Sequence, residues 1–167
     1  MRPRLAAAGA ALLALAPAAA GTAGTPTLGE SPSGCVLRLL EHRSGRELMR
    51  LPPPEHGPLG TPELRLAFEH SVLGTTVVDR YRFTPQPLLV EEEFEGEGYG
   101  LPAAAGPGEQ LERIGTRQRL RLQRPVDPLV VRAMPAQRMR LLLPSGELPL
   151  AALGAPAVEI RAEGCTP

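Results

Sequence analysis

Three side chains suited to acid–base chemistry or cation binding occur within a short span of the chain: His70, Asp79 and Glu92. Each stands where the surrounding apolar alternation favours an apolar residue. Two carboxyl groups and an imidazole can share a proton, form an ion pair, or hold a cation such as Ca²⁺ or Zn²⁺. They are therefore the first candidates for a binding or metal site.

A second candidate segment is the glycine-rich run "GEGYGLP" at residues 96–102, which directly follows the strand carrying Glu92. Backbone N–H groups at Gly98 and Gly100, with the hydroxyl of Tyr99, suit an anion. A wide turn that needs positive φ explains the same glycines without any ligand. The segment lacks the strand–loop–helix context of a nucleotide-binding fingerprint.

The pairing of the strands decides whether the polar side chains meet. In "LRLAFEHSVLGTTVVDRYRF" (64–83), a two-residue turn at Gly74-Thr75 brings the apolar faces of two strands together. This register places His70 opposite Asp79 on the inner face of the hairpin.

The next strand extends this row. A four-residue loop at 84–87 places Asp79 opposite Glu92 and Arg80 opposite Glu91. The predicted inner row of His70, Asp79 and Glu92 is then about 10 Å wide. On the outer face, Glu69, Arg80 and Glu91 form a charged row that is typical of a solvated ladder and contributes little stability.

The role of the inner row stays open on sequence grounds. One interpretation is a histidine–carboxylate ion pair that only neutralises these buried charges and has no further role. Another is a ligand or metal site formed by His70, Asp79 and Glu92. Catalysis is the third, but no catalytic residue is assigned. Ser71 points away from His70 because neighbouring strand residues face opposite sides, and no G-x-S-x-G motif occurs.

Short apolar runs separated by Gly and Pro extend over residues 35–163. Runs of this length with alternating polarity are typical of strands joined by tight turns. We expect an all-β fold, an antiparallel sandwich or small barrel of about eight short strands, in one domain at 35–167.

The first 23 residues have the order of a secretory signal peptide. Arg2 and Arg4 precede a short alanine-rich apolar run, and small residues follow. We expect cleavage near 20–23, a linker at 24–34, and export to the periplasm or the exterior; an uncleaved anchor is the alternative. No later segment is apolar and long enough to span a bilayer.

Cysteines occur only at positions 35 and 165. In an oxidising compartment, two cysteines at the edges of one domain indicate a disulfide, here between Cys35 and Cys165. Two unpaired thiols are the alternative. Metal ligation by the cysteines is disfavoured, since no C-x-x-C spacing occurs.

The charge balance argues against nucleic-acid binding. The chain has 18 basic and 18 acidic residues, and every basic residue is arginine. Loss of a leader with two arginines leaves a small acidic excess, whereas nucleic-acid-binding proteins normally carry a basic patch. Aromatic residues make up only 3% of the chain, which leaves little for bases to stack on.

The segments "FEHSV", "VVDRYRF" and "EEEFEGEGYGLP" resemble a bacterial family, domain of unknown function 1850, over about residues 35–163. The matching positions are His70, Ser71, Val72, Asp79, Gly98, Gly100, Leu101 and Pro102. The segment "GEGYG" is more acidic and glycine-rich than is usual in the family.

The resemblance implies a small exported protein associated with tripartite ATP-independent periplasmic (TRAP) transporters that use TAXI-type solute-binding proteins. We therefore expect an accessory or binding module of a periplasmic solute-uptake system. Its partner would be a transporter membrane subunit or a solute-binding protein, and His70, Asp79, Glu92 and Tyr99 would form the site. The alternatives are a metal-dependent or acid–base enzyme that uses the same row, and a structural envelope protein.

Overall fold

The computed structural model describes residues 34–51, 55–56, 62–83 and 85–165. All of them belong to one structural unit at 32–167. The expected signal peptide and all of the expected linker except Gly34 lie outside the described residues. Within the described part of the chain, no helix has the length and apolar character needed to cross a membrane.

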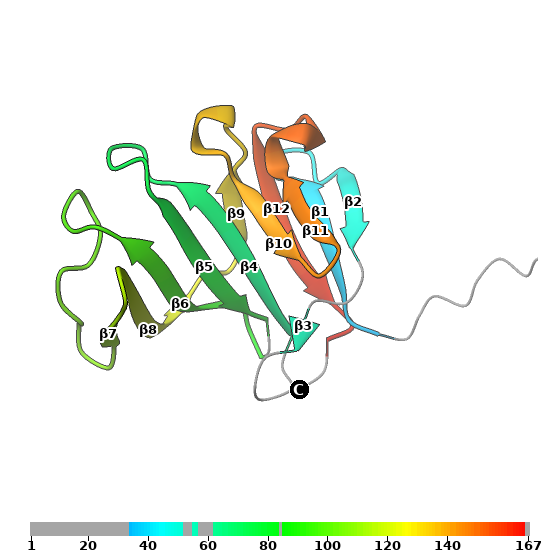
Figure 1. Ribbon diagram of the computed structural model, residues 1–167. Helices are drawn as coiled ribbons and strands as arrows, with labels where there is room; N and C mark the ends of the chain where they lie inside the picture. The colour runs from blue at the N-terminus through cyan, green and yellow to red at the C-terminus, as the bar shows by residue number, and fades with distance from the viewer. Residues whose placement is uncertain (1–33, 52–54, 57–61, 84, 166–167) are drawn as a thin grey trace, which may run out of the picture. The chain divides into compact units, whose positions relative to one another are not determined.

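The smaller of two antiparallel sheets combines the two ends of the described chain. Its strand order is β2-β1-β12-β9, and Figure 1 shows the blue β1 beside the red β12. The strands are β1 (Val36–Glu41), β2 (Glu47–Leu51), β9 (Leu129–Arg132) and β12 (Ala157–Glu163). In β1 and β12 the alternation turns Leu37, Leu39, Val158 and Ile160 inward, where each is at most 1% exposed.

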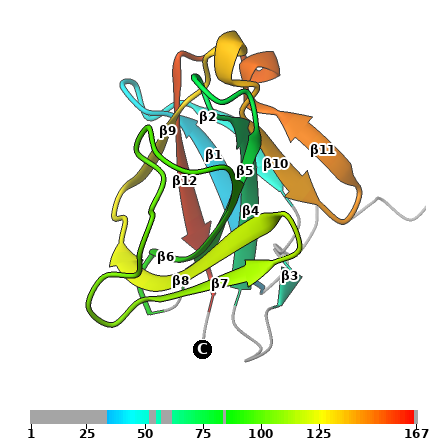
Figure 2. The same cartoon turned by 60° about the vertical axis from the view of Figure 1, so that its left-hand side comes forward.

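The larger sheet has the order β11-β10-β4-β5-β6-β8-β7, and the short β3 pairs with β4. Figure 2 shows β7 and β8 coming forward at one end of this sheet. The strands are β3 (Glu55–His56), β4 (Pro62–Glu69), β5 (Thr76–Arg82), β6 (Leu88–Glu95), β7 (Gln110–Ile114), β8 (Arg117–Pro125), β10 (Arg140–Leu143) and β11 (Gly146–Pro149).

One hydrophobic core joins the two sheets. It includes Leu39 and Ile160 from the smaller sheet and Leu66, Phe94 and Leu120 from the larger one. Full burial of each such side chain contributes roughly 1.5–3 kcal/mol. The fold is therefore a sandwich of two antiparallel sheets, as the strand pattern predicts; the alternative of a closed barrel is not observed.

Two short 3-10 helices, η1 (Pro135–Gln137) and η2 (Leu150–Leu153), connect strands at one end of the sandwich. Leu150 of η2 is fully buried in the core. Three strands, β3, β7 and β11, lie outside the short apolar runs from which we expected strands. They are short or highly polar, so the apolar alternation that marks a strand is weak in them.

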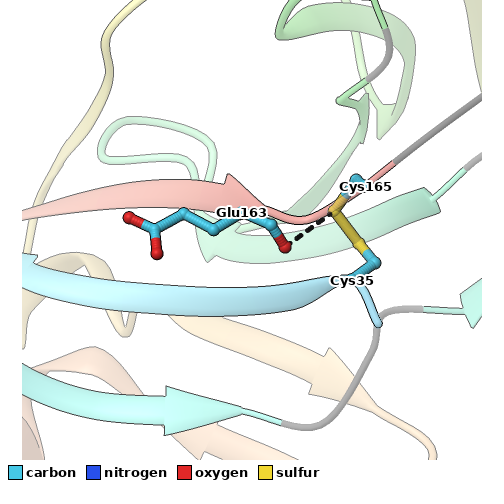
Figure 3. Close-up of a disulfide and its surroundings, with 3 residues drawn as sticks. All are labelled: Cys35, Glu163 and Cys165. Atoms are coloured by element: carbon cyan, nitrogen blue, oxygen red, sulfur yellow. Dashed lines mark hydrogen bonds between the residues drawn. A yellow bond between two sulfur atoms is a disulfide. The ribbon is translucent and has the colours of Figure 1, made fainter. Parts of the chain in front are cut away.

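The predicted disulfide between Cys35 and Cys165 is confirmed. Figure 3 shows it at the point where β1 begins and β12 ends. β1 and β12 are paired along their whole length, from Val36 opposite Glu163 to Glu41 opposite Val158. The Cα atoms of the two cysteines are 4.1 Å apart, so the bond closes the last step of this ladder.

The predicted register of the β4–β5 hairpin is wrong. Asp79 pairs with Leu66, and the last pair before the turn is Glu69 with Thr76. The connection is a six-residue loop at 70–75, closed by backbone hydrogen bonds from the His70 N–H to the Thr75 oxygen and from the Gly74 N–H to the His70 oxygen. The displacement is an even number of residues, so the inward faces of both strands stay inward.

The predicted pairing of β5 with β6 is confirmed where it matters for the site. Asp79 lies opposite Glu92, and Arg80 lies opposite Glu91. Beyond Arg80 the register shifts by one residue, so that Tyr81 pairs with Leu89 rather than Val90. Such a β-bulge bends the strand and is not encoded in simple alternation.

Candidate functional site

Asp79 is a buried carboxyl group on the inner face of the larger sheet, with only 7% of the residue exposed. Its Oδ2 accepts a hydrogen bond of 2.9 Å from the Tyr81 hydroxyl. Its Oδ1 has no hydrogen-bond partner among the described residues. Burial raises the pKa of Asp79 to about 7; Glu92 adds to the rise, while the Tyr81 hydroxyl and Arg124 oppose it.

Glu92 continues this acidic pair toward solvent. Burial raises its pKa above the usual range, Arg124 opposes the rise, and Glu109 adds to it. Arg124, near the end of β8, forms an ion pair of 3.4 Å with Glu109. The Asp79 and Glu92 carboxyl groups therefore favour retention of a proton or the approach of a cationic group.

His70 does not face Asp79, since it begins the loop that joins β4 to β5. Its Nδ1 accepts hydrogen bonds from the backbone N–H groups of Val72 (3.3 Å) and Leu73 (3.2 Å). An acceptor on Nδ1 requires the proton on Nε2, which lies 3.2 Å from the Tyr99 carbonyl oxygen and donates to it. His70 thus ties the β4–β5 loop to the glycine-rich segment.

The glycine-rich segment makes a tight turn beside His70. The Leu101 N–H donates to the Gly98 oxygen at 3.1 Å. Gly98, Tyr99 and Gly100 all have positive φ, of 82°, 54° and 96°. Glycine adopts this region without cost and tyrosine does not. The strained Tyr99 backbone holds its side chain 71% exposed at the turn.

These elements enclose a cavity of about 290 Å³ on the inner face. Of the predicted site residues, the structure brings His70, Glu92, Tyr99 and Gly100 to its wall. Asp79 lies behind Glu92, outside the lining, and Gly98 closes the turn without lining the cavity. The remaining lining residues are Phe68, Val77, Leu101, Pro102 and Arg124.

The predicted three-residue row is not assembled, because the longer loop removes His70 from the strand position opposite Asp79. Within the described ranges, no three His, Cys, Asp or Glu side chains converge in a way that would hold a metal ion. A divalent cation on His70, Asp79 and Glu92 is therefore not supported by the geometry.

Sequence reasoning missed Arg124 and Tyr81 as members of this site. Both lie on the same strand face as an inward-facing residue two positions earlier: Tyr81 follows Asp79 on β5, and Arg124 follows Leu122 on β8. Continuing the alternation of β8 to its end was the signal that would have found Arg124.

The outer face of the same sheet carries a network of charges around Glu91, whose side chain is only 10% exposed. Arg80 donates to its Oε2 at 2.6 Å, and Arg119 and Arg121 lie at 3.6 and 3.8 Å. The predicted pair of Arg80 with Glu91 is thus formed. Glu69 is not part of it, because the register shift places Arg65 opposite Arg80.

The fold and the site define the class of protein: an antiparallel β-sandwich with an open pocket lined by apolar side chains, by the carboxylate of Glu92 and by the guanidinium group of Arg124. The sequence profile described as "Domain of unknown function (DUF1850)" matches residues 64–150. The match runs from the third residue of β4 to the first residue of η2 and includes every residue that lines the pocket. The chain belongs to this family. No significant match was found among curated proteins or solved structures.

Proposed function

We propose that the protein is an exported binding module that serves as an accessory of a periplasmic solute-uptake system. Two features support export: the leader-like pattern of the first 23 residues and the disulfide between Cys35 and Cys165. Disulfides form and persist in oxidising compartments such as the periplasm, and they are rare in the cytosol.

The observation that carries the binding role is the cavity of about 290 Å³ beside Glu92. Four side chains or backbone segments from separate parts of the chain meet there: Phe68 of β4, Glu92 of β6, the turn at 98–101, and Arg124 of β8. A concave apolar surface with a few convergent polar groups is the usual form of a binding site.

The occupant that fits this cavity is a protein segment with an apolar side chain beside a basic one. Phe68, Val77 and Leu101 offer apolar contact. Glu92 with Asp79 behind it attracts a cation, and Arg124 is already engaged by Glu109. The exposed Tyr99 ring can cover a bound cation from the solvent side.

The partner in this proposal is a subunit of a TRAP-type transporter, either the membrane component or the solute-binding protein. The resemblance to a family associated with such transporters, carried by the segments at 68–72, 77–83 and 91–102, supports this choice. The pocket residues lie in that same region of the chain, apart from Arg124.

Site-specific photo-crosslinking in the envelope of the native host tests the proposal. A photo-reactive phenylalanine analogue replaces Tyr99, which is 71% exposed, and in a control replaces Ile114, which is 44% exposed on β7. We expect the Tyr99 position to label a transporter subunit and the Ile114 position not to do so.

A second arm removes the charge from the pocket. Glu92→Gln keeps the shape of the side chain, and we expect it to weaken the crosslink from position 99 while the protein stays folded. Absence of any transporter subunit among the products, or equal labelling from both positions, contradicts the proposal.

A further inference from the structure

A second cavity, of about 260 Å³, lies on the opposite face of the larger sheet from the pocket at Glu92. Neighbouring residues of the same strands line the two pockets in turn. On β5, Val77 lines the first pocket and Val78 and Arg80 line the second; on β6, Glu92 lines the first pocket and Glu91 and Glu93 line the second. Arg65 and Arg119 complete it. Three guanidinium groups and two carboxylates therefore line the space. Two further carboxylates lie just outside the lining, Glu63 at 3.5 Å from Arg80 and Glu112 at 3.5 Å from Arg119, so Arg65 is the cavity arginine without an ion pair among the described residues.

The two arginines at one side of this cavity are a like-charge pair. Arg65 of β4 lies directly opposite Arg80 of β5, and facing like charges destabilise a sheet. The other cross-strand neighbour of Arg65 is Leu142 of β10, which offers no counter-charge. Among the described residues, Arg65 forms no ion pair, so its charge is not neutralised by a described side chain.

The two carboxylates of the cavity already pair with its other two arginines, Arg80 and Arg119. Glu91 accepts from Arg80 at 2.6 Å, and Glu93 accepts from Arg119 at 2.6 and 2.8 Å. They hold these guanidinium groups in place and have less capacity left for Arg65. The Nε atom of Arg80 is buried and has no hydrogen-bond partner within the described ranges.

From this arrangement we propose that the outer-face cavity binds a multiply charged oxyanion between Arg65 and Arg80, with Arg119 on the far side. Guanidinium groups present planar pairs of N–H donors that match phosphate and carboxylate oxygens, and such charge-assisted bonds are the strong ones. The anion separates the two facing arginine charges and accepts from the guanidinium group of Arg65, which forms no ion pair among the described residues. This site is independent of the pocket proposed for a transporter subunit.

Isothermal titration with inorganic phosphate tests the site, against sodium chloride at matched ionic strength. We expect saturable binding of one phosphate per chain that chloride does not reproduce. Arg65→Gln should reduce the affinity about tenfold or more, because charge-assisted hydrogen bonds are lost. Arg65 has no described ion pair, so this variant should fold normally, which thermal unfolding checks.

Two further variants separate a specific site from general charge. Arg43→Gln removes the same charge from the exposed turn between β1 and β2, and it should leave phosphate affinity unchanged. Glu93→Gln removes a negative charge from the cavity lining and should tighten binding. If no saturable phosphate binding is seen, or if Arg65→Gln and Arg43→Gln have equal effects, the proposal is overturned.

Discussion

Asp79 binds its proton more tightly in the folded chain than in the unfolded one, because the sandwich removes its carboxyl group from water. Its folded pKa is about 7, against an ordinary value of 3.8. Between these values the folded state holds more protons than the unfolded state, so the free energy of unfolding falls as pH rises. The difference corresponds to a few kcal/mol, on the order of 1.4 kcal/mol per pKa unit.

The corresponding prediction concerns Asp79→Asn. The wild-type protein should lose stability from pH 4 to pH 7 and level off above that range, and the variant should lose less than half as much. Urea unfolding at four pH values across this window measures the effect. Glu92→Gln is the comparison, since the Asp79 carboxyl group remains in that variant. If the pH dependence of the unfolding free energy is the same in Asp79→Asn as in the wild type, the Asp79 carboxyl group ionises normally in the folded protein.

Glu91 presents the opposite case, a buried carboxylate surrounded by arginines. Removing Glu91 takes away the shortest ion pair of Arg80, which keeps only Glu63 at 3.5 Å, while Arg119 keeps Glu93 at 2.6 Å. The cost should be larger than for an exposed pair. Because Arg80 and Arg119 keep about 30% of their side chains exposed, the cost should be below that of a fully buried pair.

We expect Glu91→Ala to lower the free energy of unfolding by about 2 kcal/mol. Glu147→Ala is the matched control, since Glu147 pairs with Arg140 at 3.0 Å but is 58% exposed, and it should cost less than about 0.5 kcal/mol. Both values come from chemical denaturation; similar losses would mean that burial of Glu91 has no energetic weight.

At the scale of elements, the β4–β5 loop depends on one side chain. The His70 Nδ1 atom accepts two backbone N–H groups, those of Val72 and Leu73. This is the role that asparagine and aspartate usually have at the start of a turn. The loop also sets one wall of the pocket, through the bond from His70 Nε2 to the Tyr99 oxygen.

His70→Ala should therefore destabilise the domain by about 1 kcal/mol, comparable to the loss of a helix cap. It should also speed amide hydrogen exchange at Val72 and Leu73 before it affects the core strands. His70→Asn should restore part of the protection, because its side-chain oxygen can accept the same N–H groups. Unchanged exchange in His70→Ala would contradict this role.

The strands were predictable where alternation is strong, and the register was predictable only where a turn is short. Asp79 and Glu92 meet as predicted, although the register of β5 with β6 shifts by one residue beyond Arg80. The apolar pattern of 64–83 fits any even displacement equally well, and the hydrogen bonds of His70 select the six-residue loop. Arg124 reaches the site because β8 extends to Pro125. The last residues of β8 are polar, so the apolar alternation does not show that the strand continues this far.

For the molecule as a whole, the disulfide closes a loop between residues 130 positions apart. In the chain-entropy model a loop of this length stabilises the folded state by about 4–5 kcal/mol. The bond joins the ends of two strands that are already paired, so little rearrangement of the folded state is needed to form it.

Reduction should therefore lower the urea midpoint of the wild-type protein substantially, while the fold remains at low urea. The variant with both Cys35→Ser and Cys165→Ser should unfold at the reduced midpoint with or without dithiothreitol. Circular dichroism follows both transitions. A wild-type midpoint that does not change on reduction would show that the ladder between β1 and β12 alone constrains these ends.

The same bond has a mechanical consequence. The chain enters the described domain at Cys35 and leaves it at Cys165, and these residues are covalently joined with 4.1 Å between their Cα atoms. Tension applied between the two ends passes through the sulfur–sulfur bond and bypasses the sheets. The sandwich is thus shielded from stretching, and both of its pockets keep their shape when the ends are pulled apart.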